Sequence, residues 1–116
     1  MSIEVSLAPY PGRVFFCENQ DETAKRFHAV TGNTYEKSSN HVGRTAADND
    51  KANVAVYFVW ADDLPTLAHE INHVCLFVFD HIDADPRGCN GEPFCYLSQH
   101  LMREAMKLKR FSNGAV

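Results

Sequence analysis

The run from Asn53 to Trp60, NVAVYFVW, constrains the fold more than any other segment. Its β-branched and aromatic residues favour a strand, and its length is enough to cross a small sheet. A helix start follows directly: Asp62 and Asp63 stand before Leu64-Pro65, where a carboxylate caps the free amides and proline fits the first turn. The sequence therefore predicts a strand that leads at once into a helix, which we expect to run to about Asp80 or His81.

Shorter segments predict the other elements. Residues 3–8 alternate apolar and polar, and residues 13–17 form a β-prone run after a turn at 9–12, so both predict strands. Acidic residues at 21–22 begin a helix that Gly32 ends, and a last helix runs from Glu92 or Pro93 through Lys109. Residues 32–52 indicate mostly loop, with a short strand around 41–47. We expect an α+β fold, a small mainly antiparallel sheet followed by two packed helices, with one domain over residues 1–111 and a polar tail at 112–116.

Composition narrows the classes of function. The net charge of −4 argues against a nucleic acid or an anionic membrane as partner. No apolar run reaches the length of a membrane span, and the first residues lack the features of a secretory signal, so we expect a cytoplasmic protein. The four cysteines include no CxxC pair and indicate reduced thiols. A chain of 116 residues can form a hydrophobic core without a metal, so a bound metal would be catalytic rather than structural.

The candidate chemistry lies in the predicted helix after the strand, in the HExxH pattern from His69 to His73. Residues four apart lie on one helix face, so the two imidazoles can reach a single zinc ion, and Glu70 stands beside them as a candidate base for a metal-bound water. The alternative is that both histidines belong to a polar face and that Glu70 is solvated between them.

A third ligand is needed, because catalytic zinc sites normally have three from the protein. Asp80 is on the same face as His73 but about 10 Å further along the axis. Glu92 opens the next helix after a loop long enough to reverse the chain, and Cys89 in that loop is its main rival. Glu92 alternatively does no more than complement the N-terminus of its own helix.

Residues 66–105, TLAHEINHVCLFVFDHIDADPRGCNGEPFCYLSQHLMREA, resemble the small HExxH metallopeptidase-like proteins of bacteriophage and prophage genomes. In these, the HExxH helix is followed by a short loop and a Glu-x-Phe-x-Tyr helix. They are similar to minimal gluzincin-type zinc peptidases, whose third ligand is a glutamate on the helix after the active-site helix. The resemblance implies a zincin-like core with His69, His73 and Glu92 as zinc ligands and Glu70 as the catalytic base.

Three hypotheses follow for the function. The first is a zinc peptidase acting on a peptide or protein, with Glu70 as general base. In that case Tyr96, His81 or His100 are candidates to stabilise an oxyanion, and the strand at 53–60, if it is a sheet edge, binds an extended substrate by strand addition. The second is a non-catalytic binding protein, a phage-type accessory or inhibitor module that keeps the metal site. The third is a metal-free helical module in which HExxH is accidental.

Overall fold

The predicted strand at 53–60 is the centre of the sheet. The structure, a computed structural model, describes residues 1–112 and contains a four-stranded sheet of order β1-β2-β4-β3. β4 (Ala55–Ala61) pairs in parallel with β2 (Arg13–Phe16) and antiparallel with β3 (Gly43–Asn49), while β1 (Ile3–Ser6) pairs antiparallel with β2. The α+β class is confirmed. The sheet is mixed, because the chain between β2 and β4 crosses one face of the sheet before returning in the same direction.

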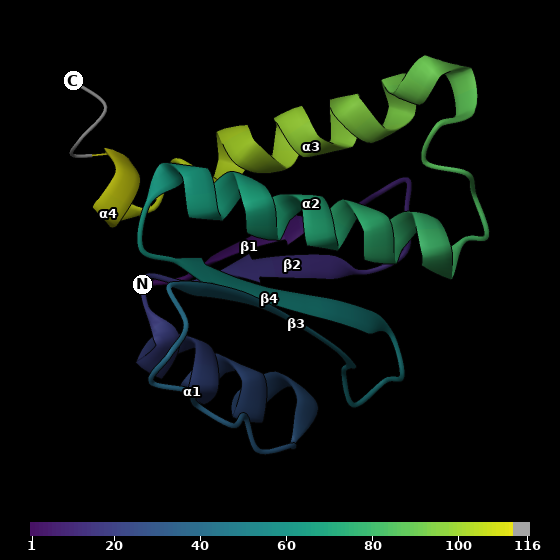
Figure 1. The fold of residues 1–116 in the computed structure, drawn as a ribbon. Coiled ribbons are helices and arrows are strands. Elements are labelled where there is room, and N and C mark those ends of the chain that lie inside the picture. Colours follow the sequence, from purple (N-terminus) through teal and green to yellow (C-terminus); the bar gives the residue numbers. More distant parts are fainter. Residues whose placement is uncertain (113–116) are drawn as a thin grey trace.

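Helices cover both faces of this sheet, as Figure 1 shows. α1 (Gln20–Thr31) lies on one face, and α2 (Leu64–His81) and α3 (Glu92–Ala105) lie on the other. Every residue of β4 is buried, with Phe58 in the cluster on the α1 side and Tyr57 in the cluster on the α2 side. A strand that is covered on both faces is apolar throughout, which explains why residues 53–60 do not alternate between apolar and polar.

The start of α2 follows the sequence signal. The Asp63 side chain accepts a hydrogen bond from the Thr66 amide at 2.8 Å, and Pro65 occupies the first turn. Leu64 and Ala68 are exposed, so not every apolar residue of α2 faces the core. The core receives seven side chains from this helix: Leu67, Glu70, Ile71, Val74, Cys75, Val78 and Phe79.

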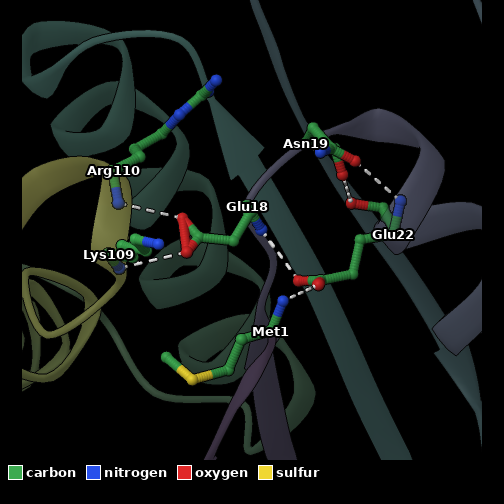
Figure 2. Close-up of polar contacts among 7 residues, drawn as sticks. Met1, Glu18, Asn19, Glu22, Lys109 and Arg110 are labelled. Carbon is green, nitrogen blue, oxygen red and sulfur yellow. Dashed lines mark hydrogen bonds and ion pairs between the residues drawn. The ribbon is translucent and has the colours of Figure 1, made fainter.

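The predicted last helix is interrupted. α3 ends at Ala105, and a separate turn, α4 (Lys109–Ser112), follows. The Glu18 carboxylate accepts hydrogen bonds from the amides of Lys109 and Arg110, at 3.0 and 3.1 Å, so a side chain satisfies two amides that a continuous helix would bond to its own carbonyls (Figure 2). The predicted tail at 112–116 thus begins inside a helical turn, and residues 113–116 lie outside the described part of the chain.

The same cluster holds the first residue of the chain. Glu22 accepts a hydrogen bond from the Glu18 amide at 2.9 Å and pairs with the amino group of Met1 (Figure 2). β1, α1 and α4 therefore meet where β2 ends. In residues 1–112, no helix combines the length and the hydropathy required to cross a membrane.

Candidate metal and active site

The HExxH histidines are brought together on the exposed side of α2. The Nε2 atoms of His69 and His73 are 3.2 Å apart, and the two rings are nearly perpendicular, at 82°. Two nitrogens bound at 2.0–2.1 Å to one tetrahedral zinc ion lie about 3.3–3.4 Å apart. The observed spacing suits either one N–H···N hydrogen bond or two lone pairs that converge on a cation.

Glu70, beside the pair on the same helix, points toward β3 at the edge of the sheet. It is 7% exposed, and Thr23 is the other buried polar or charged residue among those described. The Thr45 hydroxyl on β3 donates to Glu70 Oε1 at 2.8 Å and also lies 3.0 Å from the Glu70 backbone oxygen. Glu70 is thus not solvated between two surface histidines, as the alternative interpretation of HExxH required.

A glycine permits this contact. A Cβ atom on Gly43 would lie 2.5 Å from Thr66 Cγ2, closer than real contacts allow, and 3.1 Å from the Trp60 carbonyl oxygen, which is also tight. Glycine at this position therefore lets β3 approach the first turn of α2 this closely. Two residues further along β3, on the same face of the sheet, Thr45 reaches Glu70.

Glu70 is buried and is one of the residues that line a surface pocket. This pocket has a volume of about 370 Å³ and is lined by Val42, Pro65, Thr66, His69 and Glu70. One histidine of the pair and the candidate base therefore share one cavity that is open to solvent. A substrate carbonyl in this cavity would lie beside both groups.

Glu92 is not brought to the histidine pair. It is exposed at the first residue of α3, and Phe94, two residues later, packs against Phe79 with ring centroids 5.7 Å apart. Phe79 lies six residues beyond His73, about 9 Å along the helix axis. Residues 1–112 contain no group of three or more His, Cys, Asp or Glu side chains placed to hold one metal ion. The ligand role of Glu92 stays a prediction from the resemblance, without support from this arrangement.

The other residues singled out from the sequence are also separate from the pair. Cys89 is exposed in the short 3-10 helix η1 (Gly88–Gly91) of the loop between α2 and α3. Tyr96 is 66% exposed on α3, and His100 is exposed further along the same helix. His81, the last residue of α2, lines a different pocket beside β3. The structure does not place any of them near Glu70.

The free edge beside α2 belongs to β3, so the condition for strand addition at 53–60, an edge position, is not met. The Val42 carbonyl accepts from the Asp62 amide and the Asp50 amide donates to the Val54 carbonyl, both at 2.8 Å, so even-numbered residues of this segment face β4. Because the backbone groups of successive residues point alternately toward and away from the partner strand, those of Thr45 and Ala47 point away from β4. In the described part of the chain, no strand pairs with β3 on that side.

Sequence reasoning missed Gly43 and Thr45. Both lie in a polar stretch interpreted mostly as loop, and the signal available was the short strand expected around 41–47 with a threonine at an inward position. Comparison of the chain with protein-family models, with curated proteins and with solved structures finds no match. The functional interpretation therefore depends on the geometry of these residues.

Proposed function

We propose that the chain is a zinc-dependent peptidase in which His69 and His73 bind the metal and Glu70 is the general base. The observation that carries the proposal is the 3.2 Å approach of the two Nε2 atoms one turn apart on α2, next to a carboxylate that borders a pocket. This extends the resemblance of residues 66–105 to small HExxH proteins of bacteriophage.

The donor set fits zinc in part. Imidazole nitrogens are common zinc ligands, and the spacing of these two matches one edge of a tetrahedron. Two protein ligands leave positions for water and for a substrate oxygen. Bound there, zinc would polarise a scissile carbonyl and make water a stronger nucleophile near neutral pH.

The surroundings of Glu70 support its role as a proton acceptor. The Thr45 hydroxyl donates to one of its carboxylate oxygens and fixes the orientation of the group, and the residue lines a pocket at the surface. A base that is held by a neighbour and partly shielded from water is pre-oriented for proton transfer. The same carboxyl group can then return the proton to the leaving amine.

The outer edge of β3 supplies a binding site for an extended peptide. Strand addition there would pair a substrate backbone with the outward N–H and C=O groups of Thr45 and Ala47. Thr45 also contacts Glu70, so a peptide bound at this edge would lie alongside the candidate base.

The role of Glu70 is tested with Glu70→Gln. The zinc-loaded protein is assayed on casein and on a fluorogenic peptide mixture, beside Glu36→Gln, a change of the same kind at an exposed loop position. We expect Glu70→Gln to keep its zinc and to lose at least about 100-fold in rate, and Glu36→Gln to match the wild type. Loss of zinc from Glu70→Gln, or hydrolysis at the wild-type rate, would contradict the assignment.

The metal site is tested separately with His73→Ala and His28→Ala, since His28 is exposed on α1, which covers the other face of the sheet. Metal analysis after dialysis should find zinc in the wild type and in His28→Ala, and none in His73→Ala. Equal zinc in all three proteins would overturn the histidine assignment. A chain that binds zinc at this pair and hydrolyses no peptide would be the non-catalytic binding protein.

A further inference from the structure

A second pocket opens between α2 and the β3–β4 hairpin. It has a volume of about 270 Å³ and is lined by Ala47, Asp48, Asn49, Ala55, Tyr57, Phe77, Asp80 and His81. We call it the Tyr57 pocket. The alanines leave room above the sheet, and the rings of Tyr57 and Phe77 are stacked with centroids 6.1 Å apart. Apart from the backbone of Ala47, the proposed peptidase does not use these residues.

The Tyr57 hydroxyl is a polar group without a partner. The residue is 4% exposed, and its oxygen makes no hydrogen bond with any residue of the described chain. No fully buried side-chain oxygen or nitrogen in residues 1–112 lacks a partner, so this hydroxyl must reach solvent at the pocket that the residue lines. A tyrosine hydroxyl is protonated at neutral pH, and burial raises the pKa of Tyr57 further, so its oxygen has a lone pair available to a donor.

The charge of the pocket favours a cation. Asp80 has no ion-pair partner among residues 1–112, and it lines both this pocket and a neighbouring one of about 390 Å³ with Leu76 and Phe77. No lysine or arginine lines either pocket. Phe77 is 42% exposed, so part of its ring is accessible to a ligand. A guanidinium or ammonium group can meet a carboxylate, an oxygen acceptor and an aromatic face together.

We propose that the Tyr57 pocket binds the side chain of an arginine or lysine residue in the peptide that the active site acts on. The identity of the ligand as part of a peptide rests on the proposed function. Asp80 would pair with the cationic group, Phe77 would stack on it, and the Tyr57 hydroxyl would accept one of its hydrogen bonds.

The position of the pocket suits a substrate lying along β3. The strand and α2 run side by side, from Gly43 beside Thr66, past Thr45 beside Glu70, to the pocket between Ala47 and Phe77. Phe77 is one helical turn beyond His73, and Asp80 is about 10 Å beyond it along the axis. An extended peptide advances about 3.3 Å per residue, so the basic residue would stand two or three positions from the bond at the histidine pair.

The test measures binding apart from turnover. A blocked pentapeptide of alanines with one arginine, moved through the five positions, is titrated into zinc-loaded Glu70→Gln protein, beside its citrulline analogue, which keeps the shape and lacks the charge. Lysine versions follow at the best position. Amide and ring NMR shifts of Tyr57, Phe77 and Asp80 report the site of binding.

We expect the arginine peptide to bind about fivefold more tightly than the citrulline peptide at the best position, and the ratio to fall toward one after Asp80→Asn. Asp83→Asn removes the same charge from a residue that does not line the pocket and should keep the ratio. Tyr57→Phe, which loses only the hydroxyl, should lower it in part. An unchanged ratio in Asp80→Asn, or equal affinity for the two peptides, would overturn the proposal.

Measuring hydrolysis of the same peptides by the wild-type protein tests the peptidase proposal independently of the pocket. Arginine-dependent binding without hydrolysis would keep the Tyr57 pocket and refute the peptidase. Hydrolysis with no preference for a basic residue would keep the peptidase and refute the pocket.

Discussion

Replacing Thr45 with valine removes one hydroxyl from beside the buried carboxylate of Glu70 and keeps the shape of the side chain. The lost hydrogen bond is 2.8 Å long and its acceptor is a carboxylate, a type of bond that contributes about 1.5–3 kcal/mol. Glu70 is 7% exposed and borders a pocket, so water can replace part of that bond. We therefore expect the free energy of unfolding to fall by about 1–2 kcal/mol, which lowers Tm by roughly 5 °C in a domain of this size.

Urea unfolding followed by far-UV circular dichroism measures this change. Thr45→Ser keeps the hydroxyl and loses a methyl group, so it separates the hydrogen bond from packing. In a Glu70→Leu background the carboxylate acceptor is gone and the backbone oxygen of residue 70 remains, so Thr45→Val should cost less than it does in the wild type. The coupling energy of this double-mutant cycle, about 1 kcal/mol, measures the bond to the carboxylate. A Thr45→Val protein as stable as the wild type, or an equal loss in both backgrounds, would refute the hydrogen bond as a determinant of the site.

Three further predictions concern separate regions. Glu92→Ala should leave zinc affinity unchanged in a calorimetric titration, because Glu92 lies apart from the histidines, whereas a loss of about 10-fold or more would place it in the metal site. Glu18→Ala should cost about 1 kcal/mol in a urea titration and speed tryptic cleavage at Lys109, because two amides of α4 lose their acceptor; an unchanged cleavage rate would contradict this. Burial raises the pKa of Cys17 to about 11 and that of Cys75 to about 12, so at pH 8 both should resist a disulfide reagent that reacts with the two exposed thiols; reaction of all four in the folded protein would contradict it.

Local signals in the sequence were enough to predict the helix starts and the central strand. A carboxylate before Leu64-Pro65 caps the helix by contacts within four residues, and the structure contains that contact. The parallel pairing of β2 with β4 was not predictable in the same way. In the sequence, α1 and β3 separate these two strands, which are neighbours in the sheet. Their pairing is therefore a long-range contact that leaves no periodic signal in either strand.

In the candidate site, too, local contacts were predictable and long-range contacts were not. The proximity of His69 and His73 follows from the helical repeat alone. The position of Glu70 depends on β3, whose residues look polar and loop-like because this edge strand is only partly buried. The contact of Thr45 with Glu70 becomes visible only in the structure, where β3 packs against α2 and Gly43 permits the close approach.

The length of the loop before α3 did not determine the position of Glu92. Ten residues between α2 and α3 are enough to bring the chain back, but they do not determine where along α2 the second helix begins. That register is set by packing, since Phe94 meets Phe79 near the end of α2, and the first turn of α3 therefore lies beside the last turns of α2. To reach His73, the start of α3 would have to move about 9 Å along the axis of α2 and separate these rings. A third zinc ligand from Glu92 thus requires a different packing of the two helices, and the titration of Glu92→Ala measures whether metal binding produces it.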